Sequence, residues 1–417
     1  MTSKERIRAA INHLVPDRIP LDFGATTVSG IHIFVIEKLR EYFGLKKHPV
    51  KLWEPYQMLG ELEDDLLDII GIDVIGFTPR NNMFGFANEG WKEFKTHWGQ
   101  VILVPEKFRT NTDEDDSVLI YPEGDINAPP SSKMPQTSFF FDAIIRQEPI
   151  LEENLDPKDN LEEFSLMTTE DISYWKEIAA RIENADKAVV ANFGGTGIGD
   201  IALVPATFLK YPKGIRDITE WYMSLVMRPD YIKTIFEKQT EIAIENLKTA
   251  FSLVGNKIDI LYVCGTDFGT QDSTFCSPET FDDIWLPYYK KINDWVHSNT
   301  QWKTFKHSCG AVASFMEHFI AAGFDIINPV QINAKGMDSN HLKKNYGKDL
   351  VFWGGGVDTQ HVLSFATPQN VRKQVLEQCE ILSKEGGFVF TTVHNVQANV
   401  PVENVVAMID ALREFNN

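Results

Sequence analysis

The feature that most limits how this chain can fold is a series of short apolar runs separated by helical segments. The runs are rich in Val, Ile and Phe, and each has the length of a buried strand. They are Val15–Gly24, Asp73–Phe77, Ala188–Gly194, Ile258–Val263, Trp302–His307, Ile326–Pro329, Val351–Trp353 and Phe388–Val393. Strands that alternate with helices favour a parallel sheet, and eight such units are typical of an α/β fold of the (β/α)8 TIM-barrel type. We therefore expect a single barrel domain over residues 1–417.

The alternation is interrupted between residues 80 and 187. This stretch has short alternating runs, the acidic run Asp113–Asp116 and a proline pair at 129–130. We expect an insertion after the second strand, made of a hairpin and loops beside the barrel. Its acidic runs are typical of a solvated surface.

Glycine and polar residues follow several of the expected strands. In a TIM barrel the carboxyl ends of the strands meet at one mouth, which holds the active site. Glycine lets a large flat ligand approach the backbone closely, although it is equally typical of tight strand-to-helix turns. The spacing of Gly195–Gly199 does not match the dinucleotide fingerprint, so a nicotinamide cofactor is not expected. The candidate cofactor-binding residues are Gly194, Gly195, Gln331, Gly355 and Asp358.

An imidazole and a thiol lie two residues apart at the end of the fifth expected strand, at His307 and Cys309. Side chains at positions i and i+2 of a strand point to one face, and both groups are zinc ligands. The alternative is a buried free cysteine beside a core histidine. His394 follows the last expected strand and can converge on the pair if the barrel closes. Asp267, after the fourth strand, is the candidate for proton transfer, or else a helix cap.

Composition excludes some classes of partner and predicts the compartment. The net charge is −19 without any cluster of Lys and Arg, which disfavours binding to nucleic acid. The first residues predict a charged amphipathic helix, and no apolar run is long enough to span a bilayer, so we expect no membrane partner. The four cysteines show no C-x-x-C spacing and indicate reduced thiols. We expect a cytoplasmic protein.

Three segments resemble the uroporphyrinogen decarboxylase superfamily. They are Pro16–Pro20, with the pattern P-D-R-x-P, His307–Gly310, and the stretch from Gly386–Phe388 through Pro401–Val405. The superfamily contains haem-pathway decarboxylases and methylcobamide-dependent methyltransferases. The resemblance covers nearly the whole chain and implies a TIM barrel.

The resemblance is closer to the methyltransferase branch. Decarboxylases follow P-D-R-x-P with an arginine-containing segment and carry an aspartate after the second strand, where this chain has Gly24–Gly30 and Thr78–Pro79. Methyltransferases of this branch hold zinc through H-x-C and a distant cysteine. His307 and Cys309 match the first two positions, and His394 stands at the third. Decarboxylases have a substrate-binding histidine there, so His394 is either a metal ligand or a substrate contact.

The resemblance thus implies a zinc-dependent methyltransferase. It would move a methyl group between a corrinoid (methylcobamide), carried on a separate protein, and a small thiol or methylated donor. Asp267 would handle the proton, and the glycine-rich loops would face the corrin ring. Two alternatives stay open: a decarboxylase of a tetrapyrrole or smaller acid, and a non-catalytic corrinoid- or tetrapyrrole-binding protein.

Overall fold

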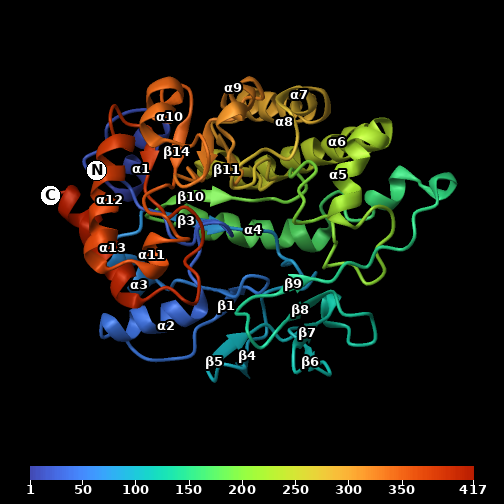
Figure 1. Cartoon of the computed structure of the whole chain (residues 1–417), viewed down its shortest axis with the longest axis horizontal. Helices are drawn as coiled ribbons and strands as arrows, with labels where there is room; N and C mark the ends of the chain where they lie inside the picture. The colour runs from blue at the N-terminus through green and yellow to red at the C-terminus, as the bar shows by residue number, and fades with distance from the viewer.

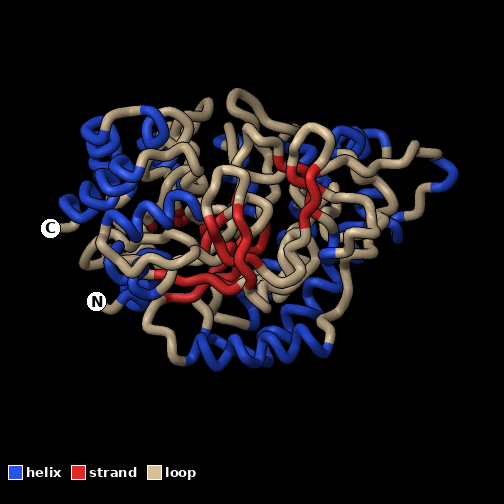
Figure 2. Tube along the Cα trace, turned by 90° about the horizontal axis from the view of Figure 1, so that it is seen from below, coloured by secondary structure: helices blue, strands red, loops and turns tan.

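The computed structural model describes residues 1–417 and is organised around one curled sheet of seven parallel strands (Figures 1 and 2). Each neighbouring pair in this sheet is parallel. Val189 and Phe388, from distant parts of the chain, lie in the same sheet, which confirms seven of the eight expected strands. In sheet order the strands are β15 (Phe388–Val389), β14 (Val351–Trp353), β13 (Ile326–Asn328), β12 (Lys303–His307), β11 (Ile260–Cys264), β10 (Ala188–Ala191) and β3 (Val74–Phe77).

The first expected strand is reduced to a single bridging residue. Leu21 forms a parallel bridge with Phe390. The Asp22 N–H donates to the Phe390 carbonyl at 2.9 Å, and the Phe390 N–H donates to the Pro20 carbonyl at 2.9 Å. On the other side, the Asp73 N–H donates to the Leu21 carbonyl at 2.9 Å. Pro20 has no N–H to add to a ladder, which limits the strand. Because this segment bonds to both edges of the sheet, the fold is consistent with a TIM-type barrel.

Helix α1 (Ser3–Ile11) closes the amino-terminal end of the strands. Arg6 donates to Asp73 Oδ1 at 2.6 Å and to Asp17 at 2.7 Å, and Arg18 donates to Asp73 Oδ2 at 2.8 Å. The Asp73 side chain is fully buried. The P-D-R-x-P segment therefore ties α1 to the start of β3, and the carboxyl ends of the strands are left for the site.

A small apolar cluster fills the interior of the sheet. It joins residues from the strands to the buried face of α1, and includes Ile7, Val74, Val190, Tyr262, Phe305 and Trp353. Tyr262 and Phe305 are register partners on β11 and β12, with ring centroids 5.4 Å apart. Because inward positions recur every two residues, His307 is the next inward residue of β12 after Phe305.

Short antiparallel strands occupy the chain between α2 (Ile33–Tyr42) and α4 (Thr169–Glu183), around β3. Figure 1 shows them gathered beside the central sheet, mostly in cyan. They are β1 (Leu52–Glu54) with β2 (Leu59–Gly60), β4 (Lys92–Lys95) with β5 (Val101–Val104), and the four-stranded sheet of β6 (Thr110–Thr112), β7 (Val118–Ile120), β8 (Ser132–Met134) and β9 (Asp142–Ala143).

The remaining helices surround the sheet, and both termini lie on the same side of the molecule (Figures 1 and 2). None of the helices has the length and apolar character that crossing a membrane requires. They are α3 (Asp64–Ile70), α5 (Ile218–Met227), α6 (Pro229–Val254), α7 (Pro278–Ile284), α8 (Leu286–Asn299), α9 (Met316–Ala321), α10 (Ser339–Tyr346), α11 (Val362–Phe365), α12 (Pro368–Leu382) and α13 (Val402–Phe415), with 3-10 turns η1 (Pro122–Gly124), η2 (Glu152–Asn154), η3 (Pro157–Asn160), η4 (Gly255–Lys257) and η5 (Ala313–Phe315).

Candidate active site

The structure brings the three candidate ligands together. Cys309 Sγ lies 3.3 Å from His307 Nε2, as expected for two side chains leaving β12 on one face. His394 arrives from the loop after β15, and its ring centroid is 5.6 Å from that of His307. One ligand atom from each of the three residues falls within 4.8 Å of the others. This geometry gives two imidazoles and one thiol a common centre.

Asn328, the last residue of β13, sets which nitrogen of His307 is free. The Asn328 amide group donates to the Trp353 carbonyl at 2.7 Å, so its oxygen faces His307 Nδ1 at 2.6 Å. His307 Nδ1 must therefore carry the proton, and the lone pair of Nε2 points toward Cys309. A hydrogen bond from the second ring nitrogen is the usual support of a metal-binding histidine. Sequence reasoning missed Asn328, although its place at a strand end was a signal.

The ionisation of the three side chains follows from their burial. Burial lowers the pKa of His307 and of His394 to about 4, so both imidazoles are neutral at physiological pH. Burial also raises the pKa of the Cys309 thiol well above its usual range, and the Asp267 carboxylate adds to this effect. Neutral imidazole is the form that binds a metal, and a bound cation would reverse the shift of the thiol by stabilising its thiolate.

The neighbouring loops hold Cys309 in place. The Cys309 N–H donates to Asp267 Oδ1 at 2.6 Å, and the Gly310 N–H donates to Gln331 Oε1 at 2.7 Å. Gly310 has a φ of +90°, and a Cβ there would lie 2.3 Å from the carbonyl carbon of Gly269. The loop after β11 and the loop after β12 thus pack backbone to backbone, which fixes the thiol relative to Asp267.

Asp267 lies at the edge of the metal-ligand group. Its Oδ1 is 3.8 Å from His307 Nε2, and part of its side chain reaches solvent. Burial raises the pKa of Asp267, while the hydrogen bond from the Cys309 N–H opposes the shift. A carboxylate that holds a proton more readily than usual, next to a candidate metal ligand, can accept or release a proton there.

His394 is positioned by the residue that follows it. The Gly30 N–H donates to Asn395 Oδ1 at 2.6 Å. The Asn395 amide group donates to the Thr27 carbonyl at 2.9 Å and to Gln57 Oε1 at 2.7 Å. The segment after the first expected strand and the β1–β2 turn therefore both support the His394 loop.

The remaining predicted site residues have different surroundings. A Cβ at Gly195 would meet nothing within 4 Å, whereas one at Gly355 would lie 2.7 Å from the Val330 side chain. Gly194 has a φ of +79° and donates its N–H to Asn192. Asp358 is buried and accepts hydrogen bonds from Asn333 and from its own loop. Gln331 and Asp358 thus hold loops in this structure, and their contact with a cofactor stays a prediction.

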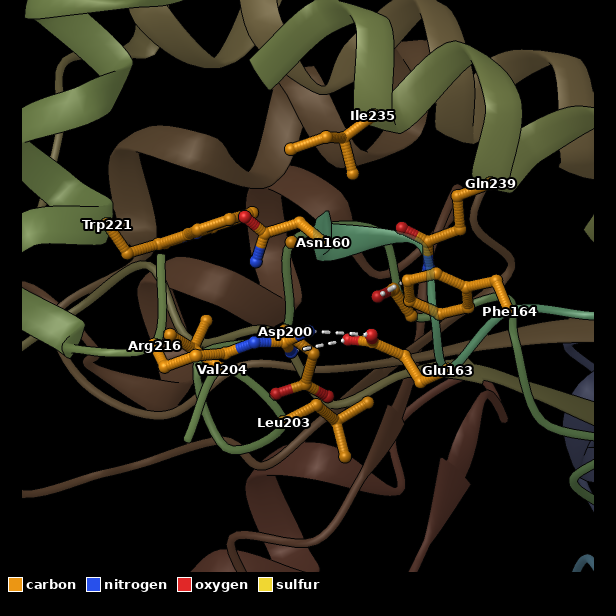
Figure 3. Close-up of a pocket in the computed structure, with 12 residues that line it drawn as sticks. Asn160, Glu163, Phe164, Asp200, Leu203, Val204, Arg216, Trp221, Ile235 and Gln239 are labelled. Carbon is orange, nitrogen blue, oxygen red and sulfur yellow. Dashed lines mark hydrogen bonds and ion pairs between the residues drawn. The ribbon is translucent and has the colours of Figure 1, made fainter. Parts of the chain in front are cut away.

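Two further polar residues at the mouth were missed from the sequence. Tyr262 is an inward residue of β11, and Asp200 follows the glycine-rich segment after β10. Burial raises the pKa of Asp200 to about 6, and the nearby Asp267 carboxylate adds to the shift. Asp200 borders a small cavity of about 30 Å³. Figure 3 shows Asp200, Trp221 and Gln239 among the side chains that line it. The period of two along β11 could have identified Tyr262, whereas Asp200 needed the tertiary structure.

The family model for uroporphyrinogen decarboxylase (URO-D) matches residues 148–415, more than half of the chain and all three candidate ligands. The chain belongs to the URO-D family. A methyltransferase from Methanosarcina mazei is similar in fold to this URO-D protein, with a TM-score of 0.56, 16% sequence identity and coverage of 100% of both chains. A hyperthermophilic β-glucosidase mutant aligns with a TM-score of only 0.40 at 10% identity, covering 94% of this chain and 99% of its own, and supports no argument. No curated protein matches the sequence.

Family membership indicates an enzyme with decarboxylase or methyltransferase chemistry. At so low an identity, the similar structure supports the fold alone. The choice between the two chemistries therefore depends on the side chains at the mouth.

Proposed function

We propose that this URO-D protein is a zinc-dependent methyltransferase that moves a methyl group between a corrinoid and a small thiol or methylated donor. The observation that carries the proposal is the convergence of His307, Cys309 and His394 within 4.8 Å. Two imidazoles and one thiolate suit zinc, and a catalytic zinc keeps three protein ligands and one open position.

The local chemistry of the ligands supports the metal. Asn328 leaves the Nε2 lone pair of His307 free, and burial keeps His307 and His394 neutral. Cys309 supplies the soft anionic ligand. Cys309 Sγ lies 3.3 Å from His307 Nε2 and within reach of His394, so the thiol faces two nitrogen ligands, which favours a shared cation over a packing role.

Bound zinc would supply Lewis acidity to a thiol, or to the methyl-bearing atom of a donor, at the open position. In transfer to a thiol, the thiol loses its proton and the sulfur–carbon bond forms. The cobalt–carbon bond of the corrinoid breaks, and its electron pair stays on cobalt. Asp267 is our candidate for receiving the proton, because it borders the ligands and its pKa is raised.

The corrinoid would approach the open mouth of the barrel, presented by a separate carrier protein. Gly195 supports this placement, since a Cβ there would meet no neighbour and the backbone is free to lie against a flat ring. We place the protein in the cytoplasm, where its free cysteines stay reduced.

The family's decarboxylase chemistry is the main alternative. A substrate with several carboxylates needs cationic groups to bind it. The carboxylates of Asp200 and Asp267 at this mouth disfavour such a substrate. The second alternative, a non-catalytic corrinoid- or tetrapyrrole-binding protein, requires no metal.

The test follows methylcobalamin by visible absorption after addition of zinc-loaded protein and candidate thiols. We expect loss of the methyl–cobalt spectrum with the unmodified protein and with Cys379→Ala, a buried cysteine on α12. We expect no loss with Cys309→Ala. Conversion of uroporphyrinogen to coproporphyrinogen, or ligand binding by a protein that takes up no zinc, would overturn the proposal in favour of the alternatives.

A further inference from the structure

Tyr262 and Asp200 face a common position beside the metal-ligand group. A Cβ built on Gly265 would lie 2.7 Å from Tyr262 Oη and 3.2 Å from Asp200 Oδ2. Gly265 has a φ that any residue can adopt, so its backbone does not require glycine. Glycine instead allows Tyr262 Oη and Asp200 Oδ2 to lie side by side against its backbone, where any side chain would collide with them. We call Tyr262, Asp200 and Gly265 the polar subsite.

The hydroxyl of Tyr262 lacks a partner in the protein. The side chain is only 7% exposed, its ring packs on Phe305, and no hydrogen bond contributes to its pKa, which burial raises well above the usual range. The hydroxyl oxygen is not among the fully buried polar atoms that lack a partner, so part of its surface stays accessible to a ligand or to water. A ligand group in the polar subsite would supply that partner.

The polar subsite adjoins the proposed zinc position. Cys264 is the register partner of Lys306, so Gly265 comes next to His307 along the neighbouring strand. Asp267, two residues further, accepts the Cys309 N–H. A small molecule whose one end occupies the open position of the metal can therefore extend its other end toward Tyr262 and Asp200.

The charge around the polar subsite is negative except for one buried lysine. Lys306 donates to the Thr266 and His307 carbonyls, and its ammonium lies 4.9 Å from the ring centroid of Phe268 and 5.5 Å from that of Phe319. The Lys306 side chain therefore points away from the polar subsite, toward the surrounding helices. With zinc bound, its charge and that of Lys306 balance Asp200, Asp267 and the Cys309 thiolate. Once Asp267 has passed the thiol proton on to solvent, a thiolate substrate adds one negative charge, which a cationic group on the same molecule would cancel.

We propose that Tyr262 and Asp200 select a substrate bearing a hydrogen-bond donor or a positive charge, such as a hydroxyl or ammonium group, a short distance from its metal-binding atom. Sulfonate or carboxylate groups are disfavoured there. This inference rests on the proposed function, because it places the substrate's other end at the metal.

The test uses the full-length protein loaded with cobalt(II) and three thiols that share a two-carbon chain. The thiols are 2-aminoethanethiol, 2-mercaptoethanol and 2-mercaptoethanesulfonate, and binding is followed by the thiolate-to-cobalt absorption. We expect the ammonium thiol to bind more tightly than the sulfonate thiol. Because the thiols differ in acidity, the decisive quantity is the change in this preference between variants. Asp200→Asn should reduce it about tenfold.

Three further variants separate the roles of the two residues and control for misfolding and for net charge. Tyr262→Phe keeps the ring and removes the hydroxyl, so it should weaken the ammonium and hydroxyl thiols several-fold and the sulfonate thiol less. Gly265→Ala should displace Tyr262 and Asp200, because its Cβ would collide with them, and so weaken all three thiols while the metal stays bound. Asp294→Asn, an exposed residue on α8 paired with Lys290, makes the same change in net charge and should have no effect.

The outcomes distinguish this inference from the proposed function. Failure of the unmodified protein to bind cobalt through Cys309 overturns both. Normal cobalt binding with the same thiol preference in Asp200→Asn as in the unmodified protein overturns the inference alone. A preference for the sulfonate thiol would also contradict it.

Discussion

At the scale of single residues, the candidate metal centre depends on a hydrogen bond made by a residue that cannot reach the metal. Asn328 receives the Nδ1 proton of His307 and is itself oriented by the Trp353 carbonyl. This chain of contacts fixes both the tautomer and the direction of the imidazole. Supporting bonds of this kind tune metal affinity without contributing a ligand.

Asn328→Ala should therefore weaken zinc binding by about 10- to 100-fold, because His307 loses the acceptor that keeps Nε2 free. Competition with a chromophoric chelator measures the affinity. Asn404→Ala is the matched control. Asn404 is likewise a buried asparagine, but it lies on α13, where its amide group donates to two carbonyls. Equal zinc affinity in Asn328→Ala and the unmodified protein would show that Asn328 does not orient the ligand.

The sequence predicted the convergence of His307, Cys309 and His394 better than the contacts that support them, for a physical reason. His307 and Cys309 are two residues apart, so the period of a strand alone puts them on one face. His394 could be added because it follows a strand of the same expected barrel. Asn328 and Asp200 acquire their roles only through contacts with other strands and loops, and no local pattern contains those contacts.

At the scale of elements, two loops fix the thiol by packing glycine on glycine. Gly310 is at a φ of +90°, and its missing Cβ is what lets Gly269 approach. Gly71, at the end of α3, has a φ of +89° with nothing near its missing Cβ. Both glycines therefore need a left-handed backbone, but only Gly310 has other atoms close to the position of its missing Cβ.

Gly310→Ala and Gly71→Ala should each lose about 1 kcal/mol of stability from the left-handed backbone. Gly310→Ala should in addition lose zinc affinity, because the clash with Gly269 displaces Cys309. Urea unfolding and zinc titration of both variants measure the two effects. Full zinc affinity in Gly310→Ala would mean that the loop contact does not position the thiol.

The β1–β2 turn carries a buried carboxyl group that links stability to pH. Glu54 accepts the N–H groups of Tyr56 at 3.1 Å and Gln57 at 2.7 Å, and burial raises its pKa from 4.5 to about 7. The folded state therefore favours the protonated form. The stabilising contribution is full below pH 4.5 and is lost as the pH rises through 7.

Glu54→Gln should remove this dependence. The unfolding free energy of the variant minus that of the unmodified protein should rise by about 2 to 3 kcal/mol from pH 5 to pH 8. Urea unfolding at both pH values measures the difference. Glu61→Gln, on the same hairpin but paired with Lys51 at the surface, should show no such gain. A parallel pH profile for Glu54→Gln and the unmodified protein would contradict the argument.

At the scale of the whole molecule, the alternation of strands and helices predicted the sheet and its order along the chain, because both follow from local apolar patterns. It overestimated the first strand. Prolines at 16 and 20 restrict that segment, and only Leu21 bridges to Phe390. Backbone hydrogen bonds on both sides of Leu21 still close the sheet, and at the amino-terminal end Asp73 adds side-chain contacts by accepting hydrogen bonds from Arg6 and Arg18.

Asp73→Asn should cost about 3 to 5 kcal/mol, because it leaves the largely buried Arg6 without its buried partner. Thermal unfolding measures the loss. Glu183→Gln, which disturbs an exposed pair with Lys257, should cost less than about 1 kcal/mol. Similar losses in the two variants would show that this ion cluster does not hold α1 to the sheet.

The proposed zinc centre can be tested directly by X-ray absorption at the zinc edge on protein purified without chelator. We expect one zinc per chain with one sulfur at about 2.3 Å and two imidazole nitrogens at about 2.0 Å. The sulfur contribution should disappear in Cys309→Ala, which should lose more metal than His307→Ala or His394→Ala because thiolate is the softest and most anionic ligand. Cys379→Ala should keep the full spectrum. Absence of zinc from the unmodified protein, or an all-oxygen and nitrogen shell that Cys309→Ala leaves unchanged, would contradict the proposed centre.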